Sequence, residues 1–427
     1  MTMTHDHPQR YALVNELHAR PFPSLTVPCV AVYLAVKEPT NAANRDRERD
    51  RAHLLALLNR HGAAHPAPEA THHSAVIGRH ELKWESHTEF VTYSAFADGV
   101  PERAFDPHAA EVFPADWLAG MPGKKVASVM VRVEPMPDDL DEVTRKLDDW
   151  FVPESLAASW VVDDAAIIAG DFQIDPSGLM RFAVFVKPGT GNRRVGRIVQ
   201  RLCEIETYRA MSMLGLGRAR ELTGRLNALD PQLAGLVTAL SDDHRAAEAT
   251  LHELLTISAE LESLATRMSF RFGATGAYEA IVNQRIEVLR EARLLGRQTF
   301  GEFMRRRYDP AMRTVKSAER RLEQMAERAQ RAGELLRTRV DVERSAQNQK
   351  LLESMDRRAD LQLRLQRTVE GLSVVAISYY AVSLATYALL PFAEALHLSK
   401  PALTAGLVPV VILAVWFVLR GIKKSMD

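Results

Sequence analysis

The C-terminal end of the chain holds two long apolar stretches without a charged residue. They run over 371–393 and 401–419, and a short connector joins them. Each is close to the roughly 20 residues that a helix needs to cross a bilayer. A core helix of a soluble protein is rarely apolar on every face over this length. The pattern therefore predicts a transmembrane hairpin, and the alternative is a buried helical hairpin within a soluble core.

The N-terminal part of the chain, up to about residue 190, alternates β-rich runs with a few helical segments. Turn residues separate the runs, as in Asp175-Pro176-Ser177-Gly178, and this arrangement is typical of strands. The predicted strands are 25–36, 75–84, 88–96, 126–133, 159–162, 165–174 and 179–186, and the predicted helices are 45–61 and 137–150. We expect 75–84 and 88–96 to pair. Residues 1–190 are therefore predicted to form a mixed α/β domain.

After residue 191 the strand pattern disappears and the chain becomes helical. Proline is nearly absent, and the expected breaks are at Asp230-Pro231, at Gly273 to Gly276 and at Pro310. The predicted helices are 193–229, 232–272, 277–308 and 311–370. The last of these would rise about 90 Å at 1.5 Å per residue. Residues 191–370 are thus predicted to form a helical stalk that leads into the first span.

The helix predicted over 311–370 carries charges on most faces and has only a thin apolar stripe. Opposite charges at i, i+4, such as Glu353 and Arg357, support an exposed helix. The stripe consists of Leu322, Met325, Ala329, Leu336, Val340, Leu351, Met355 and Leu365. Its near-heptad spacing suits a coiled-coil seam. Packing on the two preceding helices would explain the same stripe, and the two interpretations are compatible.

The first span has an apolar arc and a broad polar remainder. The arc consists of Val374, Ile377, Ala381, Leu384, Ala385 and Ala388, and it should face lipid. Hydroxyl side chains cover the rest of the helix, and such groups favour protein partners or a wet cavity over lipid. We therefore expect the protein to be a homo-oligomer. In the alternative, the serines and threonines bond their own backbone carbonyls and the tyrosines sit near the membrane interfaces. Pro409 should kink the second span.

The charge distribution sets the orientation and excludes some functions. The chain has 54 Lys and Arg and 54 Asp and Glu, and this balance argues against a nucleic-acid binder. Positive residues flank the outer ends of both spans and prefer the cytoplasmic side. They are Arg364, Arg367, Arg420, Lys423 and Lys424. Both termini should therefore be cytoplasmic, which agrees with two cysteines and a polar, His-rich N-terminus unlike a secretory signal.

The fold class that follows is α+β. It comprises a mixed α/β cytosolic domain over 1–190, a helical or coiled-coil stalk over 191–370 and a two-helix transmembrane hairpin over 371–420. Residues 421–427 form a short basic cytosolic tail.

The candidate chemistry outside the membrane is sparse. His244, Glu248 and His252 share one helix face at i, i+4 and i+8, and these residue types bind divalent metals; a solvated helix face is the simpler interpretation. No catalytic motif is present. We therefore expect no enzymatic activity and no cofactor.

Two further segments suggest contacts with other molecules. The segment 187–194 is a glycine-containing turn between a strand and a helix, where Arg193, Arg194 and Arg197 could contact an anion. A tight turn without a ligand is the simpler interpretation. Near the N-terminus, His18 and Arg20 lie next to Pro21. We predict a turn there whose side chains form an interface.

Three segments resemble a family of uncharacterised proteobacterial membrane-anchored proteins, a domain of unknown function. They are Asn15-Glu-Leu-His-Ala-Arg-Pro-Phe22, Arg197-Ile-Val-Gln-Arg-Leu-Cys-Glu-Ile-Glu-Thr-Tyr-Arg209 and Thr368-Val-Glu-Gly-Leu-Ser-Val-Val-Ala-Ile-Ser-Tyr-Tyr380. The resemblance covers essentially the whole chain. It implies a bacterial inner-membrane protein without an assigned activity, and it supplies no catalytic residue.

The architecture is also similar to that of CorA-type divalent-cation channels, in which long helices assemble a pentameric funnel and the first span lines the pore. This resemblance implies a divalent cation as ligand. It places Gly371, Ser378, Tyr379, Ser383 and Thr386 at the pore or in helix packing. The Gly-Met-Asn signature of that family is absent, which argues against selectivity for Mg²⁺.

Two functional hypotheses follow from these patterns. The first is an oligomeric inner-membrane protein that transports or senses ions through its first span. The alternative is a membrane-tethered scaffold or sensor in which the hairpin is only an anchor.

Overall fold

The computed structural model describes residues 6–11, 13–14, 21–40, 44–239, 247–395 and 399–424. The predicted site residues His18, Arg20 and His244 lie outside these ranges. The chain divides into two compact units. The first unit comprises residues 1–243 and 252–332, and the second comprises 244–251 and 333–427.

The first unit is built on a mixed nine-stranded sheet with the order β2-β3-β4-β1-β5-β8-β7-β6-β9. The pair β5–β8 is parallel and the other neighbours are antiparallel. The strands are β1 Cys29–Lys37, β2 His72–Ile77, β3 His80–Ser86, β4 Phe90–Asp98, β5 Lys124–Pro135, β6 Ala157–Val161, β7 Ala166–Ile174, β8 Met180–Val186 and β9 Ala292–Arg293. The predicted mixed α/β character is confirmed.

The single strand predicted over 75–84 is wrong, because two strands and a tight turn occupy this region. Ile77 at the end of β2 pairs with His80 at the start of β3. Gly78 between them has a φ of +59°, a conformation that glycine adopts at little cost. The β-rich composition on both sides of Gly78 explains why the sequence pattern appears continuous.

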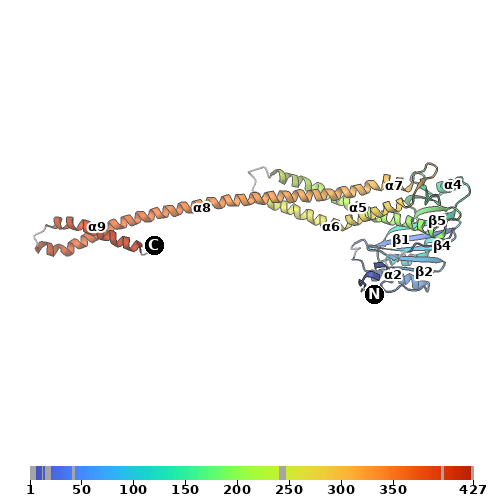
Figure 1. Cartoon of the computed structure of the whole chain (residues 1–427), viewed down its shortest axis with the longest axis horizontal. Helices are drawn as coiled ribbons and strands as arrows, with labels where there is room; N and C mark the ends of the chain where they lie inside the picture. Colours follow the sequence, from blue (N-terminus) through green and yellow to red (C-terminus); the bar gives the residue numbers. More distant parts are fainter. Residues whose placement is uncertain are drawn as a thin grey trace, which may run out of the picture. The chain divides into compact units, whose positions relative to one another are not determined.

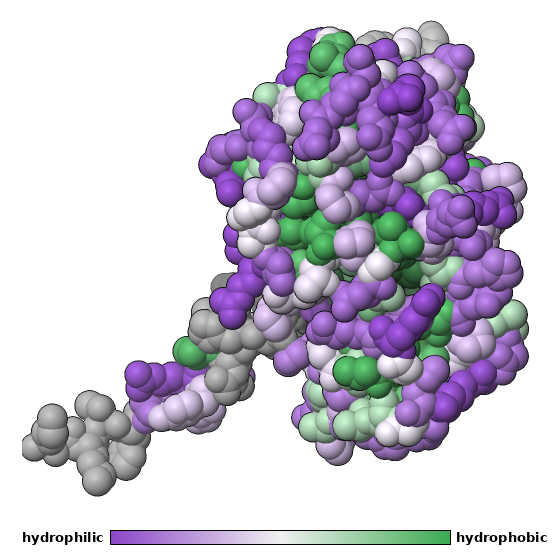
Figure 2. Space-filling view, turned by 90° about the vertical axis from the view of Figure 1, so that its right-hand side faces the viewer, coloured by the Kyte–Doolittle hydropathy of each residue, from purple (hydrophilic) through white to green (hydrophobic). Residues whose placement is uncertain are grey.

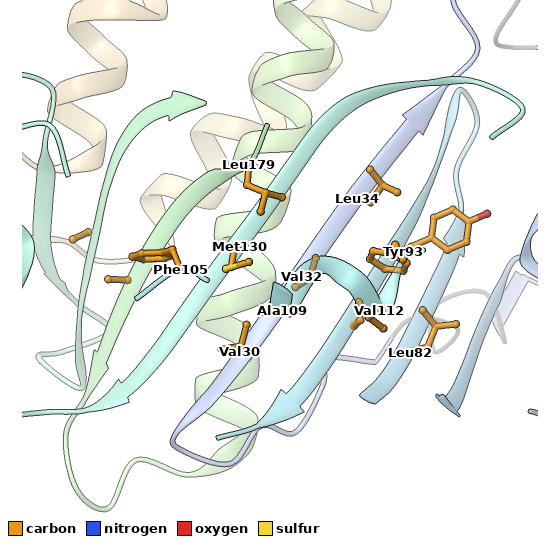
Figure 3. Close-up of a cluster of buried hydrophobic side chains, with 14 of the residues drawn as sticks. Val30, Val32, Leu34, Leu82, Tyr93, Phe105, Ala109, Val112, Met130 and Leu179 are labelled. Atoms are coloured by element: carbon orange, nitrogen blue, oxygen red, sulfur yellow. The ribbon is translucent and has the colours of Figure 1, made fainter. Parts of the chain in front are cut away.

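One face of the sheet carries the main hydrophobic core. Alternate residues of β1, namely Val30, Val32, Leu34 and Val36, point to this face, as period-2 alternation requires. Figure 3 shows several of these side chains on the same side as Ala109 and Val112 of η2 (Pro107–Val112). Three helices add core residues to this layer: α2 (Arg47–Arg60), α3 (Ala115–Ala119) and α4 (Leu140–Trp150).

The opposite face of the sheet is covered by α5 (Asn192–Ala239), which contacts β1, β5 and β8. Ala31 and Tyr33 of β1 point to this side. The hydroxyl of Thr207 on α5 donates a hydrogen bond to the Tyr33 hydroxyl at 3.0 Å. The sheet is therefore buried between two layers of helices. The outer surface that Figure 2 displays is mostly hydrophilic, with hydrophobic groups recessed between polar ones.

The predicted helix break at Asp230-Pro231 is wrong, because α5 continues through Pro231. Leu229 and Leu233 are buried on either side of it. Asp230 is paired with Arg328 and, at 3.2 Å, with Arg321, both from the helix packed alongside. Tertiary contacts thus outweigh the loss of one backbone hydrogen bond.

The predicted break at Gly273–Gly276 is also wrong, because α6 (Ala247–Glu287) runs through both glycines. The helix predicted over 277–308 is instead divided. The end of α6 is followed by β9, a short strand that the sequence analysis missed, and then by α7 (Phe300–Arg307). A capping box between Thr299 and Glu302 begins α7.

The chain ends in two helices, α8 (Asp309–Ala395) and α9 (Lys400–Lys424). The predicted helix over 311–370 and the first predicted span are thus parts of one element, which rises about 130 Å. In Figure 1, α9 folds back along the end of α8. Both helices contain stretches long and apolar enough to cross a membrane, and only 11% and 0% of these stretches are buried. This exposure argues against the alternative of a buried core hairpin.

Candidate functional site

A cavity of about 230 Å³ lies between the sheet and α5 in the first unit. We call it the sheet–helix cavity. Its walls come from β1, β3, β4, α5 and α6, together with Phe22 of the N-terminal segment. The lining residues are Phe22, Ala31, Tyr33, Lys83, Glu85, His87, Phe90, Ser94, Phe96, Val199, Gln200, Cys203, Glu204, Thr207, Tyr208 and Arg285.

Charged side chains of both signs line the sheet–helix cavity. The Lys83 Nζ atom lies 3.1 Å from Glu85 Oε1 and donates a hydrogen bond to Gln200 Oε1 at 3.2 Å. The Gln200 amide donates to Glu204 Oε1 at 2.7 Å, and Glu204 is also paired with Arg285 of α6. A polar chain therefore connects β3 to α6 across the cavity.

Local geometry explains how these residues come together. Lys83 and Glu85 are two positions apart on β3, so they point to the same face of the sheet. Gln200 and Glu204 are one helical turn apart on α5, so they also share a face. The residues of β3 contact those of α5 because α5 lies against the face of the sheet to which Lys83 and Glu85 point.

The thiol and the phenol in the cavity stay neutral. Burial raises the pKa of the Cys203 thiol well above its usual value, and the neighbouring Glu204 and Glu206 charges raise it further. Burial also raises the pKa of the Tyr33 hydroxyl, although the hydrogen bond with Thr207 opposes this shift. A neutral thiol is a poor nucleophile, so Cys203 is not activated for covalent chemistry.

An aromatic cluster forms another part of the cavity wall. The ring of Phe90 lies edge-on to Tyr208 at a centroid distance of 6.0 Å, and His87 stacks on Phe90 at 4.4 Å. Tyr208 stacks in turn on Tyr278 of α6 at 5.5 Å. The cavity thus combines flat apolar surface with paired charges, which suits a small ligand that carries both charges.

The five residues predicted for the pore or for helix packing do not share one environment. Ser378 and Thr386 are buried, with 7% and 6% exposure. Their hydroxyl oxygens have no hydrogen-bond partner among the described residues. Tyr379 is 69% exposed, Gly371 is exposed and Ser383 is half-buried.

The helix α9 lies along the end of α8 (Figure 1). The half-buried positions of α9 are Leu403, Thr404, Leu407, Val411 and Val415, a stripe at helical spacing. The Lys400 Nζ atom lies 5.7 Å from the centre of the Tyr387 ring, which joins the two helices near their connector.

The three arginines predicted to contact an anion lie in different environments. Arg194 donates a hydrogen bond to the Val162 carbonyl at 3.0 Å and lies 3.5 Å from Asp163. Arg193 is exposed and Arg197 is half-buried. Arg194 thus supports the turn between β6 and β7.

Of the candidate metal ligands, the structure describes Glu248 and His252, whereas His244 lies outside the described residues. Glu248 forms an ion pair with Arg344 at 2.6 Å. His252 is exposed. Within the described ranges, no group of three or more His, Cys, Asp or Glu side chains could hold a metal ion.

Sequence reasoning missed the residues of the sheet–helix cavity. Leu82 and Trp84 alternate with Lys83 and Glu85, and such alternation normally indicates a strand with one solvent-exposed face. The available signal was the segment 197–209, which supplies Gln200, Cys203, Glu204, Thr207 and Tyr208. That segment carries one of the three family resemblances.

A comparison with protein families matches residues 5–426 to the family described as "Protein of unknown function (DUF3422)". No curated protein matches the chain.

Proposed function

The chain belongs to the DUF3422 family of proteins of unknown function, and on that premise we propose that it is a membrane-anchored sensor of a small zwitterionic molecule. In this proposal the sheet–helix cavity binds the ligand and the C-terminal hairpin is an anchor. The membrane is the bacterial inner membrane, with both termini in the cytoplasm, and the protein binds its ligand without transforming it.

The observation that carries this proposal is the set of paired charges around the sheet–helix cavity. The side chains of Lys83 and Glu85 are 8% and 10% exposed. Buried ion pairs contribute little to stability compared with apolar residues of similar volume. A binding role explains why charged side chains line this cavity. An ion pair presents one cation and one carboxylate, which match the carboxylate and the ammonium group of a zwitterionic ligand.

The size of the cavity supports a ligand of about amino-acid size. A cavity of about 150 Å³ is known to hold benzene. The sheet–helix cavity has about 230 Å³. The rings of Phe90 and Tyr208 would contact a flat side chain, and Glu204 and Arg285 would contact the ammonium and carboxylate groups.

The hairpin supports an anchoring role because its candidate pore residues are divided between two faces. Tyr379 is exposed, whereas Ser378 and Thr386 are buried. A pore formed by the first span needs its lining residues on one face. Homo-oligomerisation stays a prediction, which the mass of the detergent-solubilised particle would decide.

The test of the sensing proposal is a binding titration with the full chain in detergent. The probes are free amino acids, with amines and carboxylic acids of matched size for comparison. We expect zwitterions to bind and singly charged probes to bind far more weakly. Glu204→Gln should raise Kd about tenfold, because it removes one charged hydrogen-bond partner.

The matched control is Glu279→Gln, which also removes a carboxylate paired with a cation on a neighbouring helix. Glu279 pairs with Lys316 at 2.7 Å and lies outside the sheet–helix cavity. We expect this variant to bind like the wild type. Absence of binding for every zwitterion, or an equal loss in both variants, would refute the sensing proposal.

A second candidate function is CorA-like ion transport, with a divalent cation as the transported ligand. The buried, unpartnered hydroxyls of Ser378 and Thr386 favour it. These two residues are two helical turns apart, and polar groups within a bilayer favour protein partners or water. In an oligomer they could meet equivalent groups of neighbouring subunits.

A further inference from the structure

We propose that a second cavity in the first unit binds a phosphate ester through a group of arginines. This site is independent of the sheet–helix cavity and of its proposed ligand. We call it the arginine cavity. It lies between α5, α6 and the end of β1, and its volume is about 850 Å³. Its cations are Lys37, Arg218, Arg225, Arg267 and Arg271.

The arginine cavity keeps an excess of positive charge after internal pairing. Glu221 is its only lining carboxylate within the described residues, and it pairs with Arg218 at 3.0 Å. Arg225 pairs with Glu260 outside the cavity. Lys37 and Arg271 share the buried Glu89. Three carboxylates thus oppose five cations, and two positive charges remain for a ligand.

Arg267 is the cation best placed for a ligand. Its Nε donates a hydrogen bond to the Ser263 carbonyl at 3.3 Å, and no carboxylate pairs with it among the described residues. Its side chain is exposed. The remaining guanidinium N–H groups form a planar fork that matches the oxygens of a phosphate.

Arg271 provides a second, independent indication of a ligand. Its Nη2 donates to Glu89 at 2.5 Å, while its buried Nη1 has no hydrogen-bond partner among the described residues. A buried donor left without an acceptor costs free energy. Because Nη1 is buried, an anionic oxygen in the arginine cavity would become its acceptor only after the Arg271 side chain turns toward the cavity.

Apolar groups beside the arginines indicate that the phosphate is carried on a larger organic body. Phe270 and Leu214 line the same cavity and are 51% and 41% exposed. Free inorganic phosphate would make no apolar contact with these two side chains. A nucleotide would place its base there, and a phospholipid would place its glycerol and acyl chains there.

The experiment measures binding to the full chain in a neutral detergent. The probes are inorganic pyrophosphate, ADP and short-chain phosphatidic acid, so that soluble and lipid sources of the phosphate are distinguished. We expect ADP or the lipid to bind more tightly than pyrophosphate, and binding to weaken as salt is added. Arg267→Gln should raise Kd about tenfold, because one charged donor fork is lost.

The matched control is Arg320→Gln. Arg320 is an exposed helical arginine whose Nε donates to the Lys316 carbonyl at 3.3 Å, as Arg267 does to Ser263. It lies outside the arginine cavity, so this variant should bind like the wild type. Because Arg267 is exposed, its replacement should leave the unfolding midpoint unchanged. The proposal is overturned if none of the three probes binds, if Arg267→Gln has no effect, or if both variants lose affinity equally.

Discussion

At the scale of single residues, Gly196 is fixed by a close approach of two backbone segments. A Cβ atom at this position would lie 1.8 Å from the Pro23 carbonyl oxygen. The Leu25 amide also donates a hydrogen bond to the Asn192 carbonyl at 3.2 Å. The segment before β1 therefore packs directly on the first turns of α5, beside the sheet–helix cavity.

Gly196→Ala should destabilise the protein by about 3 kcal/mol, because backbone atoms must move to admit the methyl group. The matched control is Gly217→Ala on the same helix, where an added Cβ meets no atom within 4 Å. This control should stabilise the helix by about 0.5–1 kcal/mol. Urea unfolding of both variants in detergent measures the difference. Equal stability of the two variants would contradict the close packing.

Single residues of the candidate site were the part least accessible from the sequence. Lys83 and Glu85 have the alternation of a solvent-exposed strand face, yet a helix more than a hundred positions later covers them. Such burial depends on a long-range contact that no local pattern encodes. The helix predicted over 137–150, by contrast, was placed within three residues of its start at Leu140. A cap depends on its nearest neighbours, and the Asp139 side chain accepts a hydrogen bond from the Asp141 amide.

At the scale of elements, Glu89 connects the sheet to α6. It immediately precedes β4 and is 2% exposed. Its carboxylate lies 3.2 Å from Lys37 of β1, and it accepts hydrogen bonds from Arg271 and Tyr278 of α6 at 2.5 and 2.9 Å. Burial alone would raise the pKa of Glu89, but these partners hold it below its ordinary value of 4.5.

Glu89→Gln should cost about 3 kcal/mol at pH 7, because Lys37 and Arg271 lose a buried counter-charge. A carboxyl whose pKa is lowered by folding stabilises the protein above its unfolded pKa, and this contribution disappears as pH falls through the folded value. The gap between wild type and variant should therefore persist at pH 5 and shrink below the ordinary pKa of 4.5. Unfolding free energies measured across this range test the prediction. A gap independent of pH would show that the charge of Glu89 is not its cause.

The type of most elements could be predicted from the sequence, whereas several boundaries could not. Strands such as β7 and β8 were expected within a residue or two, because hydrophobic runs and the turn at 175–178 mark them. The helix breaks expected at Pro231 and Gly273 were wrong, because the packing of buried neighbours outweighs the local preference of these residues. These neighbours are Leu229 and Leu233 beside Pro231 and Phe272 beside Gly273. The strand β9 was missed because two residues carry no periodic pattern.

At the scale of the whole molecule, the pair of apolar helices was the most predictable feature, since both stretches are long and apolar enough to cross a membrane. Replacement of this hairpin tests whether it is only an anchor. A chain in which an unrelated two-span anchor replaces residues 371–419 should still bind zwitterions and phosphate esters. The wild-type chain in liposomes should carry no cation flux.

Flux of a divalent cation through the wild type, and its loss in the exchanged chain, would contradict the anchoring role and support the second candidate function. A matched flux control is Ser378→Ala with Thr386→Ala, which removes only the two buried hydroxyls. Under the anchoring proposal this variant behaves like the wild type in both assays.

The position of β9 in the sheet has a consequence for biosynthesis. Trp160 of β6 pairs with Ala292, so the edge of the sheet is finished by residues that follow two long helices in the chain. Because the ribosome delivers residues in order, the edge of the sheet at β6 stays unpaired until this late segment emerges. The apolar stretches of α8 and α9 are translated later still. The first unit can thus be complete before the apolar stretches become available for insertion into a bilayer.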